Sequence, residues 1–391
     1  MLWQSRRVAD MTNLEKTFED ILVQALSRSD LTEDQIAAMP TLVLKSFAPH
    51  AASEMLKGLK RAAPKMLREH KKSDAGFERR NYRRWKKPLD LLELLWNISE
   101  EVGGKFNQTE RPAAVVAKDY QFEALVSLHA RALLISREVL CLLYGGYPDG
   151  ALSRWRSLHE IAVTAVFLQK HDQEVSHRYL ASFPFAALNA AKQLNEHAER
   201  ANMTPFLEEE LAEMKQRCDG FEARFGKEMH NERGWASPAL KNPKPTFAQL
   251  EKAVALDHWR PRYRWASQHT HGGYRPALAM LGTAESTQPV HLVGQSNSGF
   301  TDPIHMTAIS LNQVTSSLLI VRPTVDNIVF LQIISDLSDE LGEVAFEVEK
   351  HSLKEAQDKV KVTKRALPVG KVKKHNKKDV SSRRTRGVRV T

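Results

Sequence analysis

Residues 119–146 read DYQFEALVSLHARALLISREVLCLLYGG, and their pattern decides the fold. Apolar residues recur at helical spacing along the stretch, Asp119 is a typical N-cap, and the closing glycine pair is typical of a helix end. A short turn, YPDG at 147–150, leads into a second helix over 150–170, with Asp149 as its expected cap. Two helices joined by so short a turn pack as antiparallel neighbours. The sequence therefore predicts an all-α, multi-helix bundle.

Helical patterns also dominate the rest of the chain, and strand signals are scarce. Further helices are expected over 13–28, 32–46, 50–72, 88–101, 172–202, 205–226, 303–322 and 324–357.

Candidate breaks divide these helices into regions. Pro40 and Pro64 are expected to interrupt their segments, and NQTERPA at 107–113 is expected to form a loop. We therefore predict three regions, which are an N-terminal helical region over 1–112, a core helical bundle over 113–358, and a tail over 359–391. The tail lacks apolar periodicity, so it is expected to be disordered.

Composition limits the class of protein. The chain of 391 residues is 42% hydrophobic and 27% charged, as is usual for soluble globular proteins. Cys141 and Cys218 lie far apart, which argues against a zinc site or a disulfide framework. No apolar stretch is long enough to cross a membrane, and the N-terminus lacks the apolar core of a signal peptide. We expect a cytoplasmic protein that needs no cofactor or metal.

Positive charge is concentrated in two segments. The tail over 359–391 holds thirteen Lys and Arg residues against the single acid Asp379, and residues 57–87 hold thirteen against three acids. Basic clusters of this kind attract phosphate backbones. The expected nucleic-acid contacts are Lys373, Lys374, Lys377, Lys378, Arg383, Arg384, Arg83 and Arg84.

The stretch RYRWASQHTHGGY at 262–274 carries the first half of a candidate site. If 261–271 is helical, Arg264, Ser267 and His271 share one stripe, whereas His269 points elsewhere. His271 would then lie in the last helical turn, where the helix dipole favours a protonated imidazole.

The predicted helix over 150–170 carries the second half. Arg156 and Glu160 stand four residues apart, which is the spacing of an ion pair on one helix face. Part of that face is apolar, so the pair needs further polar partners, and the strip over 261–271 is one place to find them. A charged Glu160 near His271 would orient the imidazole and raise its pKa.

Each feature also has a plain structural interpretation. Arg156 with Glu160 is equally typical of a structural ion pair, and His271 of a histidine that binds the last carbonyls of a helix. His129 and His159 are typical of core histidines. The basic tail is also consistent with a role in solubility alone.

The run YGGYPDGALSRWRSLHEIAVTAVFL, followed about a hundred residues later by SQHTHGG, resembles a bacterial family of uncharacterised helical proteins. The family pattern is an Arg-x-x-x-Glu helix and a later Ser-x-x-x-His element. These correspond here to Arg156, Glu160, Ser267 and His271, and the resemblance covers about 119–280.

That family is in turn similar to the HEPN superfamily of small, often dimeric helical bundles found in toxins and phage-defence proteins. Many of its members are metal-independent ribonucleases with an Arg-x(4–6)-His motif. Five Arg–His pairs in this chain have that spacing, including Arg264 with His269 and Arg262 with His269. The shared stripe favours Arg264 with His271, although Trp265 replaces the polar residue that usually follows the arginine.

Two hypotheses follow. In the first, the protein is a HEPN-like, metal-independent ribonuclease of toxin or defence type that works as a homodimer, with His271 as general acid and base. Arg264 and Arg156 would stabilise charge on the phosphate, while Glu160 and Ser267 orient the histidine. In the second, the protein is a non-catalytic helical module that binds nucleic acid or a protein partner, and the same polar residues fix helix packing.

Overall fold

The computed structural model describes residues 14–27 and 30–366, with side chains as far as residue 358. Every regular element in these ranges is a helix, which confirms the predicted all-α fold. The chain divides into two compact units between Arg79 and Arg80. None of the helices in the described ranges is long and apolar enough to cross a membrane.

The first unit contains α2 (Leu14–Leu26) and the beginning of α3 (Glu33–Ala117). Thr32 and Gln35 form the expected capping box, with backbone-to-side-chain hydrogen bonds of 2.9 and 3.4 Å. The predicted breaks at Pro40 and Pro64 are wrong, because α3 continues through both. Each proline removes one backbone hydrogen bond, and the helix-favouring residues around it carry the helix across.

The predicted loop over 107–113 is also wrong, since α3 runs on to Ala117. Val102, Phe106 and Ala114 are buried on this part of α3 and belong to the hydrophobic core. Their burial outweighs the weak helix propensity of the intervening polar residues. The expected boundary at residue 112 therefore has a continuous helix on both sides.

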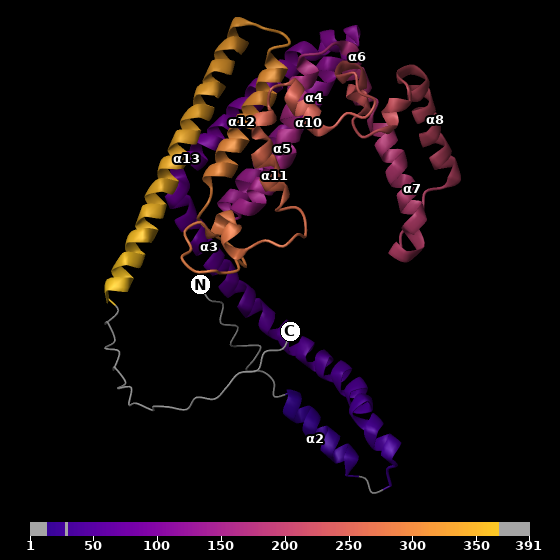
Figure 1. Cartoon of the computed structure of the whole chain (residues 1–391), viewed down its shortest axis with the longest axis vertical. Coiled ribbons are helices and arrows are strands. Elements are labelled where there is room, and N and C mark those ends of the chain that lie inside the picture. The colour runs from indigo at the N-terminus through magenta and orange to yellow at the C-terminus, as the bar shows by residue number, and fades with distance from the viewer. Residues whose placement is uncertain (1–13, 28–29, 367–391) are drawn as a thin grey trace, which may run out of the picture. The chain divides into compact units, whose positions relative to one another are not determined.

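The core of the second unit is built on α4 (Tyr120–Tyr144), α5 (Pro148–Gln169) and α12 (Thr301–Leu319), which pack against one another. The predicted α4–α5 hairpin is confirmed, and Asp119 caps α4 by accepting a 2.9 Å hydrogen bond from the Phe122 amide. The helix α13 (Val325–Ala366) packs along α12 (Figure 1). Large side chains fill the centre, among them Trp85, Trp155, Phe167 and Phe300.

The expected helix over 172–202 is split into α6 (Gln173–Leu180) and α7 (Phe183–Ala201). Pro184, in the first turn of α7, favours a new helix start at this point. The helix α8 (Glu208–Phe225) packs against α7 as a hairpin (Figure 1).

Shorter elements complete the second unit and bring the candidate site together. They are α9 (Ser237–Leu240), α10 (Phe247–Ala253), α11 (Arg260–Ser267), and the 3-10 turns η1 (Lys227–His230), η2 (Gly234–Ala236), η3 (Asp257–Trp259), η4 (Ala277–Ala279) and η5 (Leu281–Thr283). Both α10 and α11 pack against α5. This packing brings the two strips identified in the sequence side by side.

Candidate functional site

The contact between α5 and α11 places Arg156 in a closed set of hydrogen bonds. Its Nε donates to Ser267 Oγ at 2.9 Å, and its Nη2 donates to the Tyr263 hydroxyl at 2.7 Å. The same Nη2 lies 3.0 Å from Glu160 Oε1, which also accepts a 2.6 Å hydrogen bond from the Tyr263 hydroxyl. We call these four residues, Arg156, Glu160, Tyr263 and Ser267, the Arg156 cluster. Three of its members were expected from the sequence to lie together, and they do.

Tyr263 is the member of the Arg156 cluster that sequence reasoning missed. It is buried, its ring lies 4.8 Å from the Arg156 guanidinium, and its hydroxyl bridges that group to Glu160. Burial and the hydrogen bond to Glu160 raise the pKa of Tyr263 to about 12, so the phenol keeps its proton at neutral pH. A tyrosine four residues before Ser267 was the available signal, because that spacing puts both on one helix face.

His271 and Arg264 lie outside the Arg156 cluster. The helix α11 ends at Ser267, so the predicted helix over 261–271 is too long by one turn. Amides 268 to 270 bond back to the carbonyls three residues earlier, at 3.1 Å each, and this tighter turn carries His271 off the helix face. Both side chains are exposed, and neither makes a hydrogen bond or ion pair within the described part of the chain.

A second polar cluster, also missed in the sequence, forms around His269. The Nδ1 atom of His269 lies 3.2 Å from Asp149 Oδ1, and these side chains are 5% and 12% exposed. Asp149 does not cap α5 as predicted: Tyr147 is the N-cap, and the Asp149 carboxylate accepts the backbone N–H groups of Leu281 and Gly282 at 2.9 and 3.0 Å. Sequence alone could not bring residue 149 to residue 281.

Arg275 completes this group, and we call Asp149, His269 and Arg275 the His269 cluster. Burial lowers the pKa of both His269 and Arg275. The positive charge of Arg275 lowers the histidine pKa further, whereas the Asp149 charge opposes the shift. The imidazole of His269 therefore loses its proton more readily than that of a free histidine.

The core holds two more histidines, as expected. His159 lies 3.1 Å from the fully buried Glu251, which is also paired with Arg260 at 3.1 Å. His129 packs against Gly103, where an added Cβ would lie 2.2 Å from the imidazole, and its Nε2 lies 3.2 Å from Thr315 Oγ1.

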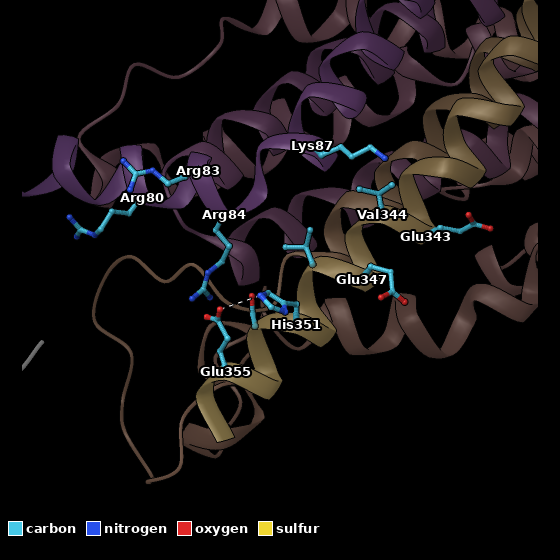
Figure 2. Close-up of a pocket in the computed structure, with 11 residues that line it drawn as sticks. Arg80, Arg83, Arg84, Lys87, Glu343, Val344, Glu347, His351 and Glu355 are labelled. Atoms are coloured by element: carbon cyan, nitrogen blue, oxygen red, sulfur yellow. Dashed lines mark ion pairs between the residues drawn. The ribbon is translucent and has the colours of Figure 1, made fainter. Parts of the chain in front are cut away.

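Two of the expected nucleic-acid contacts, Arg83 and Arg84, line a groove of about 730 Å³ between α3 and α13. Figure 2 shows basic side chains on the α3 side and acidic side chains, including Glu343 and Glu347, on α13. Arg84 already has partners within the protein: it pairs with Glu285 at 2.6 Å and donates a hydrogen bond to the Asn297 carbonyl at 3.1 Å. Arg83 is exposed and makes no such pair within the described residues.

The remaining expected contacts, Lys373, Lys374, Lys377, Lys378, Arg383 and Arg384, lie outside the described residues. In the first unit, five exposed basic residues lie on one face of α3 at spacings of four, four, three and four. They form the Lys57 face, which comprises Lys57, Arg61, Lys65, Arg68 and Lys72.

The comparisons with known proteins locate one family. Residues 122–288 match a family of unknown function (DUF5677), so this part of the chain resembles an uncharacterised family. The matched range contains both the Arg156 cluster and the His269 cluster. Neither the curated proteins nor the solved structures contain a match to the chain. Within the described residues, no group of three or more His, Cys, Asp and Glu side chains is arranged to hold a metal ion.

Proposed function

We propose that this protein is a non-catalytic helical module that binds nucleic acid through its basic stretch at 57–87 and its basic tail at 359–391. The Arg156 cluster then fixes α11 against α5 as a structural network. Its arginine, tyrosine and carboxylate are bonded to one another, which leaves little capacity for a reacting substrate.

The Lys57 face is the observation that carries this proposal. Like charges four residues apart on a helix repel one another by about 0.2–0.5 kcal/mol for each pair. Lys57 has an acidic partner, Glu54 at 2.7 Å, but the other four members make no ion pair within the described residues. The face extends along about 22 Å of helix, which is long enough to contact several successive phosphates.

The test is binding of labelled single-stranded RNA and duplex DNA of about 20 nucleotides, measured by fluorescence anisotropy between about 50 and 200 mM salt. Replacing all five residues of the Lys57 face by Gln should weaken binding and lower the slope of log affinity against log salt by about 3. Gln at the six tail positions named above should lower it by a similar amount.

A charge-matched control separates a specific face from net charge. It replaces five exposed basic residues elsewhere by Gln, namely Lys192, Arg200, Arg217, Lys244 and Lys252. This variant should bind within about twofold of the wild type. Equal losses in both five-residue variants, or displacement by polyglutamate as effective as by RNA, would contradict the proposal.

The second candidate is the HEPN-like ribonuclease of bacterial toxin or phage-defence type, acting in the cytoplasm as a homodimer. The observation in its favour is that Arg264 and His271 are exposed and have no hydrogen-bond or ion-pair partner in the described part of the chain, and are thus available to a substrate. In this case, wild-type protein cleaves RNA in EDTA, and His271→Ala abolishes cleavage. Equal rates in the two proteins exclude His271 as the catalytic base, and sedimentation gives the oligomeric state.

A further inference from the structure

The His269 cluster contains two buried polar atoms that have no partner among the described residues. They are Nε2 of His269 and Nη1 of Arg275. Only 5% of the His269 side chain is exposed, so water at the surface does not solvate its Nε2 atom. Buried donors and acceptors are nearly always bonded, and two orphans in one cluster need an explanation.

The rest of the cluster is held firmly. Two backbone N–H groups fix the Asp149 carboxylate, which in turn faces Nδ1 of His269. With the Asp149 carboxylate 3.2 Å from Nδ1, we assign the imidazole proton to Nδ1 and the lone pair to Nε2. The backbone of Gly282 passes close to this carboxylate, since a Cβ there would lie 3.4 Å from Asp149 Oδ2.

Arg275 is positioned beside the same indole ring as His269. Its guanidinium carbon lies 5.8 Å from the Trp265 ring centre, and the His269 ring lies 6.0 Å from it. Nε and Nη2 of Arg275 both donate to the Ala279 carbonyl, at 3.1 and 2.6 Å, and these bonds fix the guanidinium. Nη1 is left with no acceptor among the described residues. The cationic donor and the lone-pair acceptor thus both lie beside the Trp265 ring, within the range at which the charge of Arg275 acts on His269.

These two atoms select the chemistry of a ligand. The charge of Arg275 disfavours a metal ion and favours an anion. The buried lone pair of Nε2 favours a group that can still donate a proton. A phosphate group near neutral pH supplies both, because its oxygens accept from Arg275 and its remaining O–H donates to His269, whereas a carboxylate has lost its only proton.

We infer that Asp149, His269 and Arg275 form a binding site for a phosphate group, either free phosphate or the 5′-phosphate of a nucleotide. The ligand enters by displacement of the segment 271–274. Tyr274 in this segment is 94% exposed, and a Cβ built on Gly272 or Gly273 would meet no described atom within 4 Å beyond the adjoining residues. This site is independent of the Lys57 face and does not rest on nucleic-acid binding.

The test is isothermal titration of the full chain with inorganic phosphate and, separately, with adenosine 5′-monophosphate. We expect saturable binding, weakened at least about tenfold by Arg275→Gln or His269→Gln, since each removes a direct contact. The matched controls Arg217→Gln and His197→Gln change the same side chains at exposed positions outside both clusters and should bind as the wild type does.

Tighter binding of the nucleotide identifies a nucleotide as the source, and equal affinities identify free phosphate. The Lys57-face variant should bind phosphate as the wild type does. This result would show that phosphate binding at the His269 cluster does not depend on the proposed nucleic-acid surface. No saturable binding of either compound to the wild type, or unchanged binding to Arg275→Gln, would overturn the inference.

A second measurement covers the case in which His269→Gln does not fold. Histidine ring NMR of the wild type should show phosphate raising the pKa of one buried imidazole, because an adjacent anion stabilises the charged form. The spectrum of His271→Gln identifies the signal of His271, the exposed histidine two residues from His269 in the chain, so that this signal can be set aside. If no imidazole titration moves with phosphate, the site does not exist.

Discussion

The Arg156 cluster and the His269 cluster come within two residues of each other in the chain, at Ser267 and His269, but they differ in how far their hydrogen bonds are satisfied. In the first, arginine, tyrosine and glutamate bond one another. In the second, one imidazole nitrogen and one guanidinium nitrogen are buried and have no hydrogen-bond partner among the residues that the structure describes. The comparison teaches that a polar cluster closed upon itself holds the fold, whereas an incomplete one is suited to bind something else.

The largest effect is expected at Glu251, whose fully buried carboxylate is paired with both His159 and Arg260. Glu251→Ala leaves His159 and Arg260 without their shared partner. We expect a loss of about 3–5 kcal/mol in unfolding free energy by urea denaturation. The exposed Glu209→Ala serves as the control, and a loss below about 1 kcal/mol would show that these buried ion pairs contribute little to stability.

The next largest effect is the pH dependence of stability that comes from His129, a buried histidine whose Nε2 has a partner in Thr315 Oγ1. Burial lowers its pKa from 6.5 to about 4. The unfolded chain therefore takes up this proton more readily than the folded chain, so stability is lost as the pH falls from 6.5 toward 4. The expected slope is about 1.4 kcal/mol per pH unit. His129→Asn should flatten it in urea titrations at several pH values, and an unchanged slope would assign the effect to other groups.

Tyr263→Phe opens the Arg156 cluster without changing its shape. Loss of the bridging hydroxyl should cost about 1–2 kcal/mol, and the exposed Tyr274→Phe should cost nothing measurable. The raised pKa of about 12 adds a second readout. Its stabilising effect is present below pH 10 and is lost as the pH rises toward 12, so the variant should lose less stability over that range than the wild type. Equal alkaline losses would argue against the bridge.

Arg275→Gln should have a small effect on stability, within about 0.5 kcal/mol, because the loss of its bonds to Ala279 is offset by removal of a buried orphan donor. Arg264→Gln, at an exposed position, should fall in the same range. Thermal unfolding compares the two. A loss at Arg275 as large as that at Tyr263 would make the His269 cluster structural, like its neighbour.

Much of this architecture could be predicted from local sequence. The α4–α5 hairpin follows from apolar periodicity and from caps at Asp119 and Gly145, which are local signals. That the strip over 261–271 supplies polar partners to Arg156 and Glu160 was also predicted, because a charged pair on a half-buried helix face requires polar neighbours, although Ser267 was expected to orient His271. The breaks predicted at Pro40 and Pro64 and the loop predicted over 107–113 were wrong. Around 107–113, burial of Phe106 and Ala114 outweighed the local helix propensity.

The rest depended on contacts distant in sequence. The turn after Ser267 separates His271 from the Arg156 cluster. The residue types do not predict this turn, because Gly272 is also a suitable residue to follow the end of a helix. The use of Asp149 to bind the amides of Leu281 and Gly282, in place of capping α5, depends on a loop more than a hundred residues away. Spacing within one helix carries no information about such partners.

The most direct test of the comparison is the melting temperature of Tyr263→Phe and Arg275→Gln, each with and without inorganic phosphate. A ligand that binds only the folded state raises the melting temperature. We predict that Tyr263→Phe melts lower than the wild type but keeps the rise with phosphate, whereas Arg275→Gln melts near the wild type and loses it. The account is contradicted if both variants melt equally low and phosphate changes neither.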